Sequence, residues 1–560
     1  MKKSMIKQCI LSLLCLLWAG QTLLAGELRE RVYLQTDKQF YLSGELVWMK
    51  FIATDLDQRL SDVSKVGYVE LLDSASAVVQ ARLVLEKGVG DGCLQLPSTL
   101  PTGNYRLVAY TRYMRNEGEE VFFEKPLAVV NTFVTNETLL TDTLLPAYSF
   151  TRREGPVSVS PDRMTYDTRS GGEIRINGLP PDLQTLSVSI AGIDLYKPSA
   201  RSGIVDWKQS MPTTGSSPAD RKFLAEYEGP ILTGKVIDLS TGEPSSKEAV
   251  RPLLGFSGGE IRLFGGQLGA AGEVTFFTKH ISGTHEIVTV ALSPSSSRYR
   301  VDIESPYATH PEKELPALRL NPAWQDELVK RSVGLQVLHA YRSDSLVREK
   351  AEKPWFQWQP DWSYLLDEYT RFTTMEEVVI EFIPGLRFRK MDGVRRLAVL
   401  TEERIGYTIG NSLVLLDGIP IVDHEVIFKY DPLKIRKIDV YKGKYVFGGQ
   451  IFDGIASFSS YEHNYPGLVV DNSTQFFDYE GTQAQRIFYM PAYRTKAEKR
   501  SPVPDFRHTL LWRPDIRTNG ESSISIPFTT SDLTGDFTIT IEGLTQTGEA
   551  LYATEQFQVK

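Results

Sequence analysis

Cysteine is scarce in this chain, whose 560 residues contain only Cys9, Cys15 and Cys93. The first two fall within the first 25 residues, a segment that we predict to be a removable leader. Only Cys93 would remain in the mature chain, and one cysteine cannot form a disulfide within its own chain. No C-x-x-C, Walker A or G-x-G-x-x-G pattern occurs, so no short motif indicates a thiol redox site or a nucleotide site.

Net positive charge and long apolar runs are also missing. The formal net charge is −8 and the sequence pI is about 5.6. No overall basic field is therefore available to hold nucleic acid. After the first 25 residues, no segment approaches the roughly 20 apolar residues that a membrane-spanning helix needs. We therefore expect no nucleic-acid partner and no transmembrane span in the mature chain.

The N-terminus has the pattern of a secretory signal peptide. Lys2, Lys3 and Lys7 precede a short apolar core, Ile10 to Ala19, and small residues follow at Ala25 and Gly26. Cleavage would remove three lysines and no acidic residue, which lowers the net charge from −8 to −11. A short anchoring helix is one alternative. A lipoprotein is another, although Leu13 and Leu14 before Cys15 make a poor lipobox.

The composition predicts a multidomain globular protein rich in short strands. The chain is 41% hydrophobic, 24% charged and 11% aromatic, with 43 glycines and 30 prolines. Its length predicts about three to five domains. Alternating strand patterns recur at about ten-residue spacing with glycine and proline between them, as in Leu46 to Ala53 and Gly67 to Leu72, which is typical of β-sandwiches.

Part of the first block recurs later in the chain. Val32, Asp37-Lys38, Tyr41 and Gly44-Glu45 are echoed with similar spacing by Val157, Asp162-Arg163, Tyr166 and Gly172-Glu173. These residues, with the turn Leu100-Pro101-Thr102-Gly103-Asn104-Tyr105, resemble the macroglobulin (MG2-like) domains of the α2-macroglobulin family. The resemblance implies two sandwiches of that type. Protease-trapping members carry a Cys-Gly-Glu-Gln thioester, whereas Cys93 lies in Gly92-Cys93-Leu94-Gln95. Covalent trapping is therefore not expected.

The polar stretch Pro198 to Asp220 interrupts the second of these sandwiches. Its composition predicts a mobile loop. In a macroglobulin-like protein such a loop is also conceivable as a protease bait, although an ordinary exposed loop is the more common explanation. A non-covalent protease inhibitor that lacks a thioester is therefore the alternative function.

Two further resemblances follow along the chain. Ile231 to Asp238, Thr241-Gly242-Glu243-Pro244 and Ala271 to Phe276 are similar to the carboxypeptidase regulatory-like fold, a small non-catalytic sandwich. Asp417-Gly418-Ile419-Pro420, Ile435 to Val440 and Gly454-Ile455-Ala456 resemble the plug domain of TonB-dependent outer-membrane receptors. Only about 100 residues follow the plug-like unit, too few for the barrel of such a receptor.

A helical connector joins these two units. Asn321 is a good N-cap and Pro322 a good first helical residue, and the face from Trp324 to Tyr341 is apolar at helical spacing. The aromatic cluster Trp355 to Tyr364 is either a ligand platform or, more commonly for such a cluster, part of a core. Thr374 to Glu377 has the pattern of a capping box before an apolar helix that ends at Pro384-Gly385.

The predicted fold is mainly β, with tandem Ig-like or macroglobulin-like sandwiches, one α+β plug-like domain and a helical connector. This order resembles large envelope proteins of Bacteroidota. The boundaries are signal peptide 1–25, macroglobulin-like sandwich 27–134, second macroglobulin-like sandwich 145–228, carboxypeptidase regulatory-like sandwich 229–308, helical and aromatic connector 309–372, plug-like domain 373–462 and C-terminal Ig-like sandwich 463–560.

Candidate catalytic residues are few. Gly255-Phe256-Ser257-Gly258-Gly259 matches G-x-S-x-G, but a nucleophile elbow needs a helix after the serine, and a strand-like run follows here. His280 and His285 lie five residues apart in a glycine-containing segment, which is not the spacing of a zinc helix. The leading hypothesis is therefore non-enzymatic, with no catalytic, cofactor-binding or metal-binding residue assigned and no cofactor expected. Ser257 as a nucleophile remains the enzymatic alternative.

The sequence thus favours an exported, multidomain binding or scaffold protein of the Gram-negative cell envelope, in the periplasm or at the outer membrane. The resemblances imply protein partners there, such as a TonB-dependent receptor or an outer-membrane protein assembly complex. The protein would then be an accessory subunit in nutrient uptake or assembly. The candidate partner-binding residues are those of the plug-like turn, Asp417, Gly418, Ile419 and Pro420.

Overall fold

A computed structural model shows a mainly β protein built as two compact units. Unit 1 comprises Met1–Tyr227, His310–Arg348 and Gln485–Lys560, and unit 2 comprises Glu228–Thr309 and Glu349–Ala484. The structure describes residues 29–560 except 75, 135–154, 197–202, 213–221, 247–249, 280, 294–297, 342–344, 348–354, 392–393 and 401–411. The predicted leader and His280 lie outside the described residues. No helix among the described residues is long and apolar enough to cross a membrane.

The first sandwich of unit 1 has two sheets. One has the order β1-β3-β6 and the other β2-β8-β7-β4-β5. Apolar residues of both sheets are buried in the space between them. The strands are β1 (Arg31–Thr36), β2 (Phe40–Leu42), β3 (Leu46–Thr54), β4 (Val66–Leu72), β5 (Ala77–Val84), β6 (Val89–Gln95), β7 (Gly103–Thr111) and β8 (Phe123–Val130).

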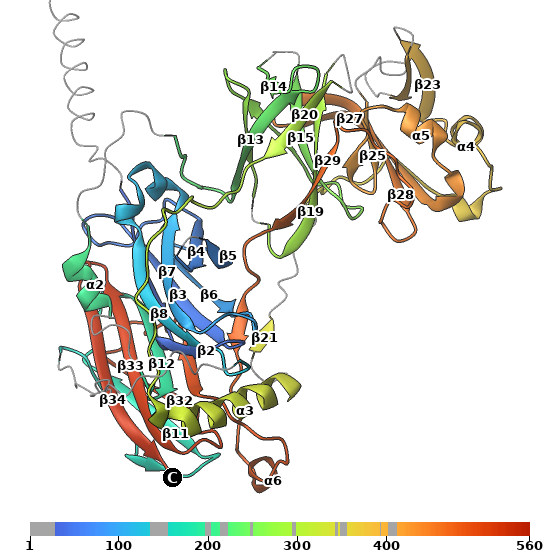
Figure 1. The fold of residues 1–560 in the computed structure, drawn as a ribbon. Coiled ribbons are helices and arrows are strands. Elements are labelled where there is room, and N and C mark those ends of the chain that lie inside the picture. The colour runs from blue at the N-terminus through green and yellow to red at the C-terminus, as the bar shows by residue number, and fades with distance from the viewer. Residues whose placement is uncertain are drawn as a thin grey trace, which may run out of the picture. The chain divides into compact units, whose positions relative to one another are not determined.

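The second sandwich of unit 1 combines two distant parts of the chain (Figure 1). Its five-stranded sheet has the order β10-β34-β33-β12-β31, and its three-stranded sheet has the order β32-β11-β9. The strands are β9 (Ser158–Pro161), β10 (Thr165–Tyr166), β11 (Gly171–Asn177), β12 (Leu183–Gly192), β31 (Thr509–Arg513), β32 (Ser523–Thr529), β33 (Gly535–Thr545) and β34 (Ala550–Val559).

Separate sandwiches at 145–228 and 463–560 were therefore the wrong division. β11 pairs with β32 and β12 pairs with β33 along nearly their whole lengths. Neither segment supplies enough strands to cover its own apolar faces, so each completes the other. A prediction that reads local periodicity finds the strands but carries no information on pairing across more than 300 residues.

The two sandwiches of unit 1 meet through a buried polar layer. Tyr33 donates a 2.6 Å hydrogen bond to Glu542, and Thr509 donates one of 2.7 Å to Asp37. Lys50 on β3 is fully buried in the same layer. The outer face of sheet β1-β3-β6, which alternation alone would assign to solvent, is therefore covered by the second sandwich.

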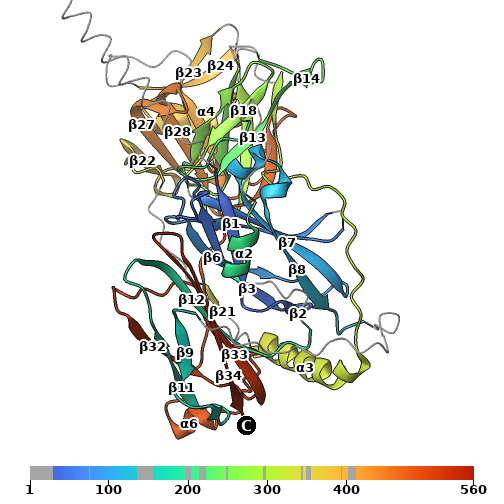
Figure 2. The ribbon, with the colours of Figure 1, turned by 90° about the vertical axis from the view of Figure 1, so that its left-hand side faces the viewer.

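An extended segment and a helix close one end of unit 1. The segment, residues 310–320, crosses the first sandwich, and we call it the strap. The 3₁₀ helix η4 (Pro322–Trp324) and helix α3 (Gln325–Tyr341) follow it. Asn321 caps the start as predicted, since its side chain accepts a hydrogen bond from the backbone N–H of Ala323. Leu335 of α3 packs against β2, and Figure 2 shows the helix beside that strand.

Segment 203–212, predicted as part of a mobile loop, is instead anchored to unit 1. It holds helix α2 (Ile204–Ser210), whose Trp207 ring lies 5.4 Å from that of Tyr33. Lys208 donates a 2.7 Å hydrogen bond to the carbonyl of Gly548. The mobile-loop prediction is wrong for these residues because Ile204 of the helix is buried. A role of the segment as a protease bait stays a prediction.

Unit 2 contains a sandwich and an α+β module. The sandwich sheets are β14-β13-β18-β17, with β20 also beside β13, and β16-β15-β19-β29. β29 comes from beyond the predicted boundary at 308, which was therefore set too early. The strands are β13 (Ile231–Asp238), β14 (Glu243–Pro244), β15 (Arg251–Phe256), β16 (Leu263–Gly265), β17 (Gln267–Leu268), β18 (Glu273–Phe277), β19 (Thr284–Leu292), β20 (Tyr299–Ile303) and β29 (Gln475–Glu480).

The α+β module occupies the plug-like region. Its sheet has the order β22-β27-β28-β25-β26, and a separate hairpin pairs β23 with β24. Thr374 caps α4 as predicted, accepting a hydrogen bond from the N–H of Glu377. The elements are β22 (Trp362–Leu365), η5 (Leu366–Glu368), α4 (Met375–Phe382), β23 (Leu386–Met391), β24 (Val394–Val399), β25 (Leu413–Leu416), β26 (Ile419–Pro420), α5 (Glu425–Lys429), η6 (Pro432–Lys434), β27 (Ile435–Phe447) and β28 (Gln450–Ser460).

Candidate functional site

The four residues predicted to bind a partner lie inside unit 2. Asp417 and Gly418 form the turn between β25 and β26, with φ values of +48° and +82°. Two consecutive positive φ values fit the type I′ turn that the Asp-Gly pair favours. All four residues from Asp417 to Pro420 are buried. Their assignment as a partner surface was therefore wrong, because the turn folds inward onto neighbouring loops.

Asp417 joins three segments of unit 2. Its carboxylate accepts hydrogen bonds from the backbone N–H of Ser460 at 2.7 Å, the hydroxyl of Ser460 at 2.6 Å and the backbone N–H of Tyr465 at 2.7 Å. Its carbonyl accepts hydrogen bonds from the N–H groups of Gly258 and Gly259 at 3.1 and 3.0 Å. A fully buried carboxylate is tolerated because these donors satisfy it. The turn therefore holds the module on the sandwich.

Ser257 belongs to the loop that Asp417 holds. It follows β15, and the next element along the chain is strand β16. Gly258 and Gly259 have φ values of +110° and +89°, which close the loop between the two strands. A nucleophile elbow places its serine between a strand and a helix. The G-x-S-x-G match at this position lacks that geometry.

The remaining sequence candidates occupy ordinary packing positions. His285 makes a 2.8 Å hydrogen bond to the carbonyl of Ser282, and its ring packs edge-on against Phe256. Cys93 is buried beside Trp48 and Trp512. Within the described part of the chain, no group of three histidine, cysteine, aspartate or glutamate side chains could hold a metal ion.

The aromatic cluster Trp355 to Tyr364 mostly fills cores. Trp355 packs at 4.9 Å from the ring of Phe264, against the core of the unit 2 sandwich. Phe356 packs on Tyr441 at 5.1 Å. The core interpretation fits these residues, although Trp358 remains 61% exposed.

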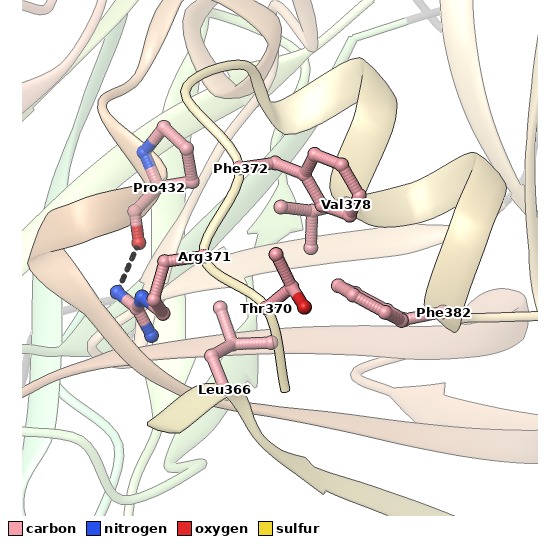
Figure 3. Close-up of a pocket in the computed structure, with 7 residues that line it drawn as sticks. All are labelled: Leu366, Thr370, Arg371, Phe372, Val378, Phe382 and Pro432. Carbon is pink, nitrogen blue, oxygen red and sulfur yellow. Dashed lines mark hydrogen bonds between the residues drawn. The ribbon is translucent and has the colours of Figure 1, made fainter. Parts of the chain in front are cut away.

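A small apolar pocket lies between α4, η5 and η6. Its walls are formed by the side chains in Figure 3, Leu366, Thr370, Arg371, Phe372, Val378, Phe382 and Pro432. Val378 and Phe382 are four residues apart, so one face of α4 supplies both. Arg371 donates hydrogen bonds to the carbonyls of Pro432 at 2.8 Å and Ile435 at 3.0 Å, which fixes this side of the pocket.

Four exposed apolar side chains contact a lining residue, are bonded to its segment or lie next to a lining residue along the chain. Leu365 and Tyr369 are each 38% exposed, Leu433 is 49% exposed and Tyr461 is 45% exposed. The ring of Tyr369 lies 4.9 Å from that of Phe382, which lines the pocket. We call the pocket and these four side chains the Tyr369 patch.

Polar contacts tie the Tyr369 patch together. Tyr461 donates a 2.5 Å hydrogen bond to Asp367, and this bond raises the pKa of Tyr461. Asp367 in turn lies 3.3 Å from the guanidinium of Arg371. Asp367, Glu368 and Asp431 are exposed around the apolar centre. An apolar centre with a charged rim is the usual anatomy of a protein interface.

Sequence reasoning missed the Tyr369 patch because its parts come from three segments. η5, α4 and η6 are separated along the chain and meet only when β22 pairs with β27. One indication of the patch was present in the sequence. In the run Tyr364 to Tyr369 apolar and polar residues do not alternate regularly, and two aromatic residues lie close to acidic residues. That pattern does not distinguish an exposed aromatic from a buried one.

The volume of the pocket limits what it can hold. Its cavity volume is about 10 Å³, which is about the space that one water molecule needs. Sites that enclose small-molecule ligands usually measure about 300 to 1,000 Å³. The pocket is therefore too small for a free metabolite or a whole inserted side chain, and a larger molecule would contact its exposed rim.

Comparisons with known proteins give structural neighbours only. No protein-family model matches the chain, and no curated protein matches it. A Salmonella alpha-2-macroglobulin is similar at 9% identity and a TM-score of 0.24, over 95% of this chain and 39% of that one. Native Escherichia coli alpha-2-macroglobulin is similar at 9% identity and a TM-score of 0.23, over 95% and 40%. The E. coli adhesin FdeC is similar at 9% identity and a TM-score of 0.16, over 49% and 65%.

This chain spans about two fifths of the length of those macroglobulins. The identities and TM-scores are too low for an activity to be transferred from these proteins. The function is therefore argued from the residues of this chain.

Proposed function

We propose that this protein is a non-enzymatic, exported binding and scaffold protein of the Gram-negative cell envelope. It acts as an accessory subunit of an outer-membrane complex, in nutrient uptake or in outer-membrane protein assembly. The Tyr369 patch is the surface through which unit 2 docks on a protein partner. The observation that carries the proposal is this exposed apolar surface with its small central pocket.

The physical reason is the cost of leaving such a surface in water. Apolar area removed from water contributes about 25 cal/mol per Å², and contiguous exposed apolar patches mark interaction sites in soluble proteins. A partner side chain that packs over Phe372, Val378 and Phe382 would bury these side chains further. Aromatic side chains around a pocket are typical anchors of binding energy.

The polar motifs of unit 2 support a binding role over catalysis. The serine of the G-x-S-x-G match sits in a strand-to-strand loop held by Asp417, and His285 is bonded to a backbone carbonyl. The sequence pattern of the leader supports export, and the plug-like resemblance supports the outer membrane as the location. Transport through this chain itself forms no part of the proposal.

Co-purification from native envelopes tests the proposal. The exposed C-terminal Lys560 accepts a tag, and proteins retained after gentle extraction are identified by mass spectrometry. Leu433→Lys places a charge in the Tyr369 patch, where a docked partner would have to bury it at a cost of several kcal/mol. We expect this variant to lose a stoichiometric envelope partner that the unchanged protein retains.

Ile451→Lys is the matched control, because Ile451 is a similarly exposed apolar residue of the same module, 55% exposed against 49% for Leu433. This control should keep the partner. Equal retention by both variants would exclude the Tyr369 patch as the docking surface. Isolation of the unchanged protein without any envelope partner would refute the accessory-subunit role.

A further inference from the structure

An exposed turn of unit 1 concentrates positive charge. Residues 494–500 carry four cations and one acid in a chain whose net charge is −8. Every residue from 494 to 500 is exposed, and helix α6 (Lys496–Lys499) lies within this segment. Figures 1 and 2 both show α6 at the margin of unit 1. We call these residues the basic turn, and its cations are Arg494, Lys496, Lys499 and Arg500.

Neighbouring residues do not neutralise the basic turn. None of its four cations forms an ion pair with another residue in the part of the chain that the structure describes. Its one acid, Glu498, accepts hydrogen bonds from the backbone N–H groups of Thr495 at 2.8 Å and Arg494 at 2.6 Å, and these bonds, more than the charge of Arg494, lower its pKa. Lys496 and Arg500 lie four residues apart, a spacing at which like charges destabilise a helix. The fold therefore gains no stability from this concentration of charge.

A paired arginine holds the backbone of the basic turn in place. The guanidinium of Arg169 donates hydrogen bonds to three backbone carbonyls, those of Lys499 at 3.3 Å, Ser501 at 2.6 Å and Val503 at 2.8 Å. Arg169 is itself paired with the carboxylate of Asp532 at 2.6 Å. It lies between β10 and β11, so the second sandwich fixes the backbone of the turn while the cationic side chains remain in water. The basic turn is therefore a pre-formed projection that presents its charges to solvent.

We propose that the basic turn binds the phosphate groups at the surface of an anionic membrane. Guanidinium groups pair with phosphate in a bidentate geometry, and lysine ammonium groups add point charges. Protein interfaces are depleted in lysine and have an apolar centre, whereas the side chains of the turn are cationic, hydroxylated or small, apart from Glu498. A membrane surface needs only such a cluster of cations, because anionic lipids attract each basic residue near the surface. This inference does not depend on the Tyr369 patch, which lies in unit 2.

Vesicle co-sedimentation tests the proposal with the mature protein purified after export. The probes are vesicles of phosphatidylcholine alone and vesicles that also contain phosphatidylglycerol. Each basic residue near an anionic surface changes binding about fivefold, so Lys496→Gln with Lys499→Gln should weaken binding to the anionic vesicles about 25-fold. Binding of the unchanged protein should fall as salt is added, because salt screens exposed charges. At equal ionic strength, inorganic phosphate should compete no better than chloride, because the exposed turn does not enclose a single ion.

Lys87→Gln with Lys222→Gln is the matched control. It removes the same charge from two exposed lysines of unit 1 that lie outside the basic turn, and vesicle binding should stay within about twofold of that of the unchanged protein. The basic-turn variant should keep the melting temperature of the unchanged protein. Glutamine and lysine have similar helix propensities, and neither Lys496 nor Lys499 forms an ion pair with a described residue.

Three results would overturn the proposal. One is equal binding of neutral and anionic vesicles, and another is equal loss of binding in the basic-turn variant and its control. The third is absence of binding to anionic vesicles. Retention on immobilised polyglutamate or duplex DNA that requires Lys496 and Lys499 would then assign the turn to an acidic protein or a nucleic acid. The Leu433→Lys variant should bind vesicles normally, which separates this test from that of the Tyr369 patch.

Discussion

Replacing the buried Lys50 with methionine should stabilise unit 1. The side chain of Lys50 is fully buried between the two sandwiches, and its ammonium has no hydrogen-bond partner among the described residues. Burial lowers the pKa of Lys50 from 10.5 to about 7, although Asp515, Glu542 and Asp91 attract the charge. The native layer therefore holds an ammonium that would be more stable in water.

The size of the effect follows from that pKa. A lysine pKa lowered from 10.5 to about 7 corresponds to about 5 kcal/mol of unfavourable free energy for the charged form. Removing the ammonium also deprives buried Glu542 of a nearby cation, which offsets part of the gain. Methionine has similar length and packs well in irregular spaces. We expect Lys50→Met to raise the free energy of unfolding of unit 1 by about 2 to 4 kcal/mol at pH 7.

The pH dependence provides a sharper test. Below pH 7, Lys50 is charged in both the folded and unfolded states, so the full burial cost is present. Between pH 7 and 10.5 the folded state releases its proton first, so the cost falls as the pH rises. The stability advantage of Lys50→Met should therefore be largest at pH 7 or below and shrink towards pH 10.

Urea unfolding followed by hydrogen exchange of the β3 and β31 peptides measures this stability. Lys125→Met is the control, because Lys125 is also buried but donates a 2.7 Å hydrogen bond to Thr36. That substitution should destabilise the unit. A Lys50→Met variant that is less stable than the unchanged protein, or whose difference from it does not vary with pH, would refute the reasoning.

Two further predictions concern polar groups that hold segments together. The imidazole of His310 bonds to Glu70 at 2.9 Å and to Glu119, and the two carboxylates raise its pKa despite the opposing effect of burial. The strap should therefore be held most firmly below pH 6.5 and loosen as the pH rises through the folded-state pKa. The hydrogen-exchange protection of residues 310–320, corrected for the intrinsic exchange rate at each pH, should be lower at pH 8 than at pH 6, and His310→Ala should remove that difference in protection. Asp417→Ala should lower the free energy of unfolding of unit 2 by about 2 to 4 kcal/mol in urea, since three donors lose a charged acceptor. Ser257→Ala should change the free energy of unfolding of unit 2 by less than about 0.5 kcal/mol. A larger effect of Ser257→Ala than of Asp417→Ala would contradict the structural role of the turn.

Local signals in the sequence predicted local structure well. Asn321 and Thr374 cap the helices that their patterns indicated, because a cap depends on residues within one turn. The strand Leu413–Leu416 and the Asp-Gly turn after it were found for the same reason. The burial of Asp417 could not be predicted, since its donors come from residues 258–259 and 460–465.

Strand pairing between segments far apart in the chain explains the features that the sequence did not predict. Trp48 and Lys50 alternate with Val47 and Met49 on β3, and alternation alone places Lys50 on the outer face. That face is buried only because strands from residues 509–545 cover it. The same limit applies to the Tyr369 patch, whose three segments are brought together by sheet pairing.

The insertion of unit 2 within the second sandwich costs little free energy. About 342 residues separate β12 from β33, and unit 2 supplies 218 of them (82 and 136 in its two segments), so the connection without unit 2 would have about 124 residues. Each doubling of a flexible loop adds only about 0.6 kcal/mol of closure entropy, so this lengthening of one to two doublings costs about 1 kcal/mol, which is no more than one or two buried side chains supply. Unit 2 has hydrophobic cores of its own. Once it has folded, the flexible part of the connection between β12 and β33 is therefore shorter. The chain can thus carry a second folded unit within a sandwich without losing the stability of that sandwich, provided that β33 and β34 are intact.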